Sequence, residues 1–211
     1  MSLFLDSAFT LEARQAMFLR LIAGITTNPA LVAKVDRQPE DVIAGLADIC
    51  PGPVFYQLVA PTVTEREAEA RRFLALRPNV ALKIACSTEN FGLAARLAKE
   101  GAKVAMTATY SAAQCYLACQ AGAAYSIPYV NRSTRLLGDG LALVAEMRAV
   151  VDACDCPTEI LAASFKSTDE VVQTIIAGAH HVTVPLALIL EMGNHAFSDQ
   201  AVEEFARASR K

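Results

Sequence analysis

The chain has 211 residues, of which 54% are hydrophobic and 19% charged, and its formal net charge is −3. This composition suits one compact globular domain over residues 1–211, and the lack of basic clusters excludes nucleic acid and anionic membranes as expected partners. The first residues lack the basic and long apolar regions of a secretory signal, and no apolar run reaches membrane-spanning length. We therefore expect a cytoplasmic protein.

Short apolar runs alternate with amphipathic stretches along the chain. Eight runs are predicted as strands, at residues 3–6, 22–26, 54–59, 80–85, 103–107, 124–129, 160–163 and 181–184. Helices are predicted between them, for example at residues 11–21, 65–76, 90–100, 112–121, 141–153 and 169–177, and an extra C-terminal helix at about 197–210. Eight evenly spaced strands with helical crossovers predict an α/β fold, a single (β/α)8 TIM barrel. A doubly wound open sheet is the alternative.

The cysteines do not have the spacing of a metal site. Cys115 and Cys119 lie in a predicted helix, and Cys154 and Cys156 lie near a turn. Neither pair is accompanied by a CxxC pair or by the histidines of a structural zinc site. We therefore expect reduced thiols, with no bound metal and no cofactor.

Lys83 is the only charged residue in the apolar run at residues 80–85. Alternation places it on the same face as Ala81 and Ala85, whose small side chains leave room beside the amine. Burial penalises an ammonium ion and favours the neutral amine that forms a Schiff base. The alternative is a lysine whose stem covers apolar surface and whose amine reaches water.

Polar residues gather at the C-terminal ends of the predicted strands, where parallel barrels hold their active sites. They are Asp6, Thr26, Asn28, Gln57, Lys83, Thr107, Tyr129, Arg132, Ser164 and Lys166. Three of them, called here the Arg132 cluster (Arg132, Ser164 and Lys166), would suit a phosphate group. The convergence of all ten on one mouth of the barrel is the main argument for a functional site.

Taken singly, several of these residues have simpler interpretations. Asp6 could cap the first helix, and Asn28 before Pro29 could form a turn and helix start. The amide of Gln57 could belong to a structural network, and Tyr129 could be a core aromatic residue with a satisfied hydroxyl group.

Together these stretches resemble the transaldolase family, particularly its small fructose-6-phosphate aldolase branch. The matching residues run in order over nearly the full chain, at 5–6, 24–29, 82–84, 107–114, 128–132 and 161–166. The most specific motifs, when found together, are Gly24-Ile25-Thr26-Thr27-Asn28-Pro29 and Ala162-Ala163-Ser164-Phe165.

The resemblance implies that Lys83 forms a Schiff base with a ketone donor. It further implies that Asp6 orients the donor hydroxyls and assists proton transfers, while Thr26 and Asn28 hold hydroxyls. The Arg132 cluster would bind the phosphate of the acceptor or of the sugar phosphate.

Two positions separate the branches of the family. Transaldolases carry glutamate at the position of Gln57 and usually phenylalanine at that of Tyr129, whereas the aldolase branch carries glutamine and tyrosine, as here. In that branch Gln57, Thr107 and Tyr129 would hold a catalytic water, with Tyr129 as the acid/base. A phenol beside a water could protonate the enamine and release a free ketone, whereas transaldolase passes the enamine to another aldehyde.

The expected activity is therefore that of a class I aldolase of the fructose-6-phosphate aldolase type, with a dihydroxyacetone-like ketone and an aldehyde such as glyceraldehyde 3-phosphate as substrates. A transaldolase is the first alternative. A sugar-phosphate-binding barrel without catalysis is the second, because Ile127 replaces a small residue and would crowd the donor if it faced the pocket. The resemblance also implies a homo-oligomer, often a decamer, in which the terminal helix contacts a neighbouring subunit.

Overall fold

The computed structural model describes residues 1–209 and contains one closed barrel of eight parallel strands. The strands follow one another around the barrel in chain order, and β8 pairs with β1 to close it. They are β1 Ser2–Asp6, β2 Ile22–Thr26, β3 Val54–Gln57, β4 Val80–Ala85, β5 Val104–Thr109, β6 Tyr125–Pro128, β7 Glu159–Ala162 and β8 His181–Val184. The predicted (β/α)8 barrel is confirmed, and the open sheet is excluded.

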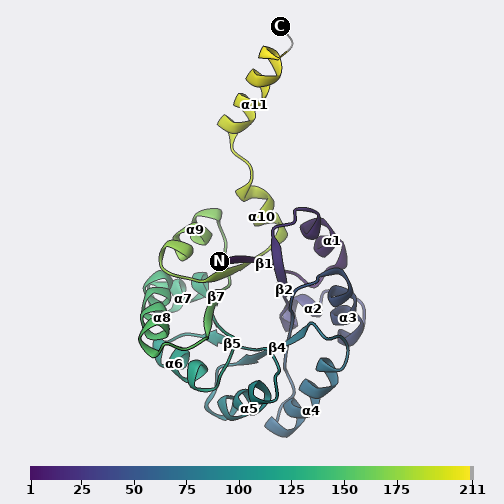
Figure 1. The fold of residues 1–211 in the computed structure, drawn as a ribbon, viewed down its shortest axis with the longest axis vertical. Helices are drawn as coiled ribbons and strands as arrows, with labels where there is room; N and C mark the ends of the chain where they lie inside the picture. The colour runs from purple at the N-terminus through teal and green to yellow at the C-terminus, as the bar shows by residue number, and fades with distance from the viewer. Residues whose placement is uncertain (210–211) are drawn as a thin grey trace.

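Helices surround the barrel as a ring (Figure 1). They are α1 Thr10–Phe18, α2 Pro29–Val32, α3 Pro39–Ile49, α4 Val63–Leu74, α5 Thr88–Lys99, α6 Ala112–Gln120, α7 Val130–Leu137, α8 Gly140–Cys154, α9 Thr168–Ile176, α10 Leu186–Met192 and α11 Ala196–Ala208. The predicted helices correspond to α1, α4, α5, α6, α8, α9 and α11. Sequence analysis did not name α2, α3, α7 and α10, of which α2 has only 4 residues.

The two faces of each strand bury different partners, and β4 illustrates the division. Val80, Leu82 and Ile84 belong to the apolar layer between barrel and helices, whereas Ala81 lies in the barrel interior. Lys83 shares the inward face of Ala81, as the alternation predicted. The strand thus buries an apolar outer face against the helices while presenting an amine to the inside.

An aromatic cluster fills the barrel interior below the mouth. Phe4, Phe55 and Tyr125 pack with ring centroids 5.7–6.4 Å apart, and Ile127 is fully buried in the same cluster. Gly24 leaves space for this packing, because a Cβ atom there would lie 2.5 Å from the Phe4 ring. The motif of residues 24–29, called here the Gly24 motif, therefore begins with glycine because a larger residue would clash with Phe4.

Four predicted strand ends differ from the structure, and the smallest difference is in β7, which ends at Ala162 rather than at residue 163. β3 ends at Gln57 rather than at residue 59, and β6 ends at Pro128, so that Tyr129 begins the turn into α7 and forms an isolated bridge with Ala163. β5 runs beyond Thr107, because a bulge at Ala108, with φ of 56°, shifts the register and lets the strand continue.

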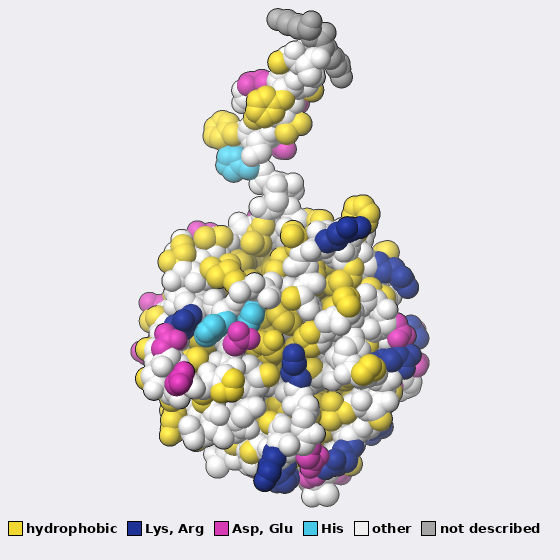
Figure 2. All heavy atoms as spheres, viewed as in Figure 1, with side chains coloured by type: hydrophobic (Ala, Val, Ile, Leu, Met, Phe, Trp, Pro, Cys, Tyr) yellow, Lys and Arg dark blue, Asp and Glu magenta, His cyan; other side chains and the backbone are white. Residues whose placement is uncertain are grey.

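The C-terminal helix α11 extends away from the barrel beyond α10 (Figure 1). None of its residues is buried, and its apolar side chains stand in the open, with Phe197 75% and Phe205 71% exposed (Figure 2). The helix was predicted to extend to residue 210, which lies outside the described residues. No helix within residues 1–209 combines the length and apolar character needed to cross a membrane.

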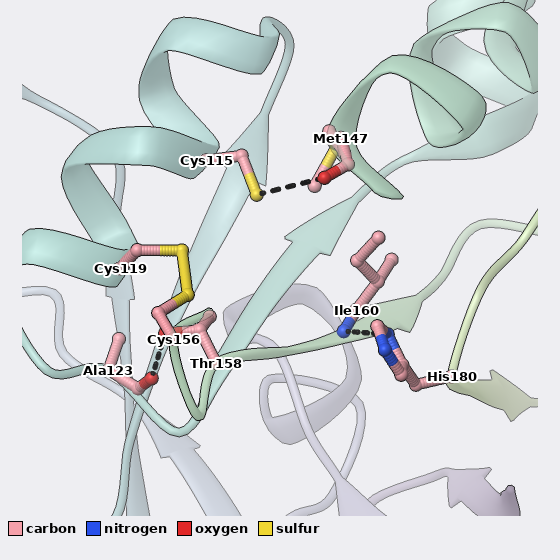
Figure 3. The surroundings of a disulfide bond; sticks show 8 residues. All are labelled: Cys115, Cys119, Ala123, Met147, Cys156, Thr158, Ile160 and His180. Carbon is pink, nitrogen blue, oxygen red and sulfur yellow. Dashed lines mark hydrogen bonds between the residues drawn. A yellow bond between two sulfur atoms is a disulfide. The ribbon is translucent and has the colours of Figure 1, made fainter. Parts of the chain in front are cut away.

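The expectation that all six cysteines are reduced is wrong for two of them. Cys119 at the end of α6 is joined in a disulfide to Cys156, which lies in the segment between α8 and β7 (Figure 3). The other four, Cys50, Cys86, Cys115 and Cys154, are free. The partners are 37 residues apart in sequence, and their pairing depends on α6 and α8 packing side by side.

Candidate active site

A cavity of about 430 Å³ opens at the C-terminal ends of the strands. Eight of the ten predicted site residues line it: Asp6, Asn28, Gln57, Lys83, Tyr129, Arg132, Ser164 and Lys166. The remaining two, Thr26 and Thr107, lie directly behind and donate hydrogen bonds to Asp6 and Tyr129. The structure thus brings the predicted residues together at one mouth of the barrel.

Lys83 lies deep in this cavity, with 2% of its surface exposed. Its Nζ atom donates a hydrogen bond to the main-chain oxygen of Thr27 at 3.1 Å and lies 5.9 Å from the centre of the Tyr129 ring. The interpretation of Lys83 as a lysine whose amine reaches bulk water is therefore wrong. The amine is held inside the cavity by the end of β2.

Asp6 lies at the end of β1, where its carboxylate accepts a hydrogen bond from the Thr26 hydroxyl at 2.9 Å. Thr26 in turn shares a 2.7 Å hydrogen bond with Thr183 on β8, so the two strands flanking β1 hold this side chain. Burial raises the pKa of Asp6, while the charge of Lys83 and the Thr26 hydrogen bond oppose the rise. A carboxyl group tuned in this way is suited to proton transfer.

Asp6 does not cap the first helix, which excludes the simpler interpretation of this residue. The residue that precedes α1 is Phe9, and no side chain caps that helix end. Ser7 provides the local hydrogen bond instead, by accepting from the Phe9 amide and donating to Glu12.

Tyr129 is the central aromatic residue of the cavity. Thr107 donates a hydrogen bond to its hydroxyl oxygen at 3.0 Å, which leaves the phenol proton free to point to another acceptor. The Tyr110 ring packs edge-on at 6.1 Å, and the Arg132 guanidinium lies 4.8 Å from the centre of the Tyr129 ring. Tyr129 is therefore positioned by its neighbours and has a proton available to a cavity molecule.

Gln57 stands beside Lys83, because the two residues are paired across β3 and β4. The Leu58 amide donates to the main-chain oxygen of Lys83 at 2.9 Å, which ties the two strand ends together. The Gln57 Oε1 atom is buried and has no hydrogen-bond partner among the described residues. The structural network considered for this amide is thus absent among the described residues, and the residue that carries this unpaired acceptor lines the cavity.

Asn28 begins a helix and also lines the cavity. Its Oδ1 atom caps α2 by accepting from the Leu31 amide at 3.0 Å, and Pro29 occupies the first turn of that helix. The residue also lines the cavity. It also lines a neighbouring cleft of about 650 Å³, to which the segment between α2 and α3 contributes several residues.

The Arg132 cluster lies at the rim. Ser164 has φ of 70°, a conformation that is strained for a residue with a side chain, and its carbonyl oxygen accepts from the Asn131 amide at 3.0 Å. Glu170 on α9 accepts from the Asn131 side chain at 2.6 Å and from the Lys166 amide at 2.7 Å. The segments that carry the cluster are therefore fixed to one another.

Sequence analysis missed three supporting residues, namely Glu69, Glu170 and Thr183. Thr183 faces the barrel interior on β8, and strand alternation could have identified it. Glu69 and Glu170 lie on outer helices among many surface carboxylates, so no sequence signal marks them. Glu69 accepts hydrogen bonds from the segment after β3, whose last residue is Gln57, and Glu170 accepts one from Lys166, a site residue in the loop after β7.

The fold and the cavity define a (β/α)8-barrel protein with a buried lysine at the C-terminal mouth. The sequence model of the Transaldolase/Fructose-6-phosphate aldolase family matches residues 3–211. The chain therefore belongs to this family of enzymes, which act on small sugar phosphates.

Named relatives match over nearly their whole length. One from Herpetosiphon aurantiacus, called a "Probable transaldolase", is 34% identical over 97% of this chain and 93% of its own. Another relative called a "Probable transaldolase", from Caulobacter sp. (strain K31), is 36% identical over 98% of this chain and 95% of its own. A mandelate oxidase variant with an FMN adduct superposes with a TM-score of 0.63 at 16% identity, over 88% of this chain but only 64% of its own, and so shares the fold alone.

Proposed function

We propose that this chain is a class I aldolase of the fructose-6-phosphate aldolase type. The observation that carries the proposal is the buried amine of Lys83 in one cavity with Gln57 and Tyr129. The residues that the resemblance links to release of a free ketone thus surround the candidate nucleophile. Ile127, which argued for a binding protein without catalysis, does not line this cavity but packs in the barrel interior.

The reaction begins when the neutral amine of Lys83 attacks the ketone carbon of a ketose phosphate and a water molecule leaves, forming an imine. Asp6 removes the proton of the hydroxyl next to the bond that breaks. Once the imine nitrogen has taken up a proton from solvent, carbon–carbon cleavage releases the aldehyde and leaves its electron pair as a neutral enamine on the lysine; that proton is given back when the imine is hydrolysed. The raised pKa of Asp6 supports its role, because a carboxyl group with such a pKa accepts and returns a proton readily.

The enamine carbon then takes a proton from a water held between Gln57 and Tyr129. The unpaired Oε1 of Gln57 can accept from this water, and the Tyr129 proton, not used by Thr107, can be donated to it. Asp6 then returns the proton that it took from the hydroxyl, through water, so that its carboxylate and the Tyr129 phenol are both restored. A second water hydrolyses the imine, which frees the ketone and restores the amine. The water lost in imine formation is thereby returned.

The Arg132 cluster is proposed to bind the phosphate group of the substrate. Arg132 and Lys166 are both cationic and exposed at the rim, whereas Lys83 lies at the bottom of the cavity. A sugar phosphate would therefore bind with its ketone end inward and its phosphate at the rim.

The test is borohydride reduction in the presence of dihydroxyacetone or fructose 6-phosphate, followed by intact-mass analysis and peptide mapping. An adduct on Lys83 would support the proposal. The absence of any adduct with a set of ketoses would contradict it and favour a barrel that binds without catalysis.

A transaldolase is the second candidate, favoured by the names of the relatives at 34–36% identity. Both reactions use the same lysine, so imine trapping does not separate them. The two reactions are separated by assays of fructose 6-phosphate with and without an acceptor aldose phosphate. Release of dihydroxyacetone without the acceptor supports the aldolase, and turnover only with the acceptor supports the transaldolase.

We also propose that α11 packs against a neighbouring copy in a homo-oligomer, for which the resemblance suggests a decamer. Phe197, Ala201 and Phe205 are spaced four residues apart and share one face of the helix, which no part of its own barrel covers (Figure 2). Light scattering of the full chain and of a chain ending at Asn194 tests this. A smaller assembly is expected after truncation, and an unchanged mass would contradict the proposal.

A further inference from the structure

Glu69 on α4 is a buried carboxylate outside the candidate active site, with 5% of its surface exposed. Its Oε1 atom accepts from the Tyr56 hydroxyl at 2.8 Å. Its Oε2 atom accepts from the main-chain amides of Val59 at 2.9 Å and Ala60 at 3.0 Å. No ion pair within residues 1–209 includes this carboxylate, so these neutral donors compensate for its burial.

The two amides belong to the segment that follows Gln57. After the Leu58 amide bonds to Lys83, the chain leaves the sheet, and the next two amides have no strand partner. Glu69 supplies the acceptor for both of them. Burial and the hydrogen bond to Glu69 also raise the pKa of Tyr56, which keeps its hydroxyl a donor to the carboxylate.

Gln57 depends on this anchoring more than its neighbours do. Its side-chain oxygen has no hydrogen-bond partner within residues 1–209, so no bond to that atom fixes the direction of the amide. Its backbone is held by the strand pairing with Lys83 on one side and by the segment that Glu69 binds on the other.

From this arrangement we infer that Glu69 is a positioning residue for the proton transfer at the enamine carbon, acting through Gln57. This inference rests on the proposed aldolase function. Glu69 itself exchanges no proton with the substrate. It fixes the end of β3, so that the Gln57 amide and its water stand where the enamine carbon accepts the proton.

The inference separates two measurable steps. Imine formation needs Lys83, whereas exchange of the donor's α-hydrogen with solvent deuterium also needs the positioned water. In that exchange a proton leaves the donor carbon as the enamine forms, and a deuteron returns. We expect Glu69→Ala to lower the exchange rate about 10- to 100-fold, while borohydride trapping on Lys83 stays within about twofold of the wild type.

A double-mutant cycle tests whether Glu69 acts through Gln57. Gln57→Ala should show the same selective loss, and the double variant should be no worse than the poorer single variant. Glu69→Gln should stay within about threefold of the wild type, because the glutamine oxygen can accept from both amides. Glu67→Ala is the matched control, since Glu67 lies on the same helix and pairs only with surface arginines. Its exchange rate should match the wild type.

Several outcomes would overturn the inference. One is a double variant whose loss of exchange rate equals the product of the two single losses. Another is a Glu69→Ala variant in which borohydride trapping falls as much as the exchange rate. A third is a Glu69→Gln variant whose exchange rate is as low as that of Glu69→Ala. If Glu69→Ala does not fold, Glu69→Asp takes its place, because the shorter side chain cannot reach all three donors. A wild-type protein that forms no adduct would overturn the proposed function itself, whereas failure of the cycle alone would leave that function standing.

Discussion

The amine of Lys83 on β4 donates a hydrogen bond to the main-chain oxygen of Thr27, 3.1 Å away at the end of β2. The contact passes over β3, the one strand between β2 and β4, and joins the lysine to the segment that also carries Thr26 and Asn28. The Gly24 motif therefore has a geometric link to the candidate nucleophile, in addition to its packing role around Gly24.

Replacing Lys83 by methionine should abolish turnover and imine trapping while the fold is retained, because methionine fills a similar volume without an amine. Activity assays and circular dichroism would check both parts. Lys99→Met is the control, since Lys99 is exposed on α5. A Lys83→Met protein that still released ketone would exclude the Schiff-base mechanism.

Tyr129→Phe should lower release of free ketone by about 10²- to 10⁴-fold, the usual contribution of a positioned acid. Trapping on Lys83 should persist, because the amine is untouched. Tyr110→Phe is a matched control, since its ring packs against Tyr129 and its hydroxyl makes no hydrogen bond among the described residues. Equal losses in the two variants would argue against Tyr129 as the acid.

Arg132→Gln should raise the KM for a sugar phosphate by about tenfold or more, the effect of losing one charge-assisted hydrogen bond. The KM for an unphosphorylated acceptor should not change. Arg135→Gln, on the same helix and exposed, serves as the control. The same rise for both acceptors would refute the assignment of a phosphate site to this residue.

Asp6→Asn should change how stability depends on pH. Because the pKa of Asp6 is raised in the folded state above its ordinary 3.8, the folded chain binds more protons just above that pH than the unfolded chain does. The contribution of Asp6 to stability therefore falls as pH rises through this interval. Denaturation at several pH values should show that the free energy of unfolding of the variant rises relative to that of the wild type from pH 3 to neutral pH. A constant difference between the two would contradict this account.

The same Asp6→Asn substitution should lower turnover about 10²- to 10⁴-fold, because the proton acceptor is lost.

Cys119→Ser should lower the free energy of unfolding by about 2–4 kcal/mol, because the disulfide closes a loop of 37 residues in the unfolded chain. A reductant should destabilise the wild type by a similar amount and leave the variant unchanged. Peptide mapping without reductant should recover a Cys119–Cys156 cross-link, and finding both thiols free would refute the pairing.

The barrel could be predicted because each strand is short, apolar and separated from the next by a helical pattern. The environment of Lys83 followed from alternation, since period two fixes which neighbours share its face. Contacts between distant segments could not be predicted in this way. Two such contacts are the disulfide between Cys119 and Cys156 and the hydrogen bonds that Glu69 accepts from the segment after Gln57. Both depend on how helices pack around the barrel.

Strand ends were the least predictable part of the site. Tyr129 continues an apolar run and was placed in a strand, but the backbone turns there because Val130 begins α7. The bulge at Ala108 likewise leaves no mark in the sequence, since alanine rarely adopts a positive φ. Eight of the ten predicted site residues line the cavity, whereas Thr26 and Thr107 are absent from its lining.

The aromatic cluster of Phe4, Phe55 and Tyr125 fills the barrel interior, and the cavity opens at the C-terminal ends of the strands. In the proposed reaction the aldehyde, bound by its phosphate at the rim, must leave before the deeper ketone can. Its departure opens a path for water toward the lysine-bound enamine. If the proposed reaction holds, we expect the two products to be released in this order, with the proton-donating water entering through the space that the aldehyde vacates.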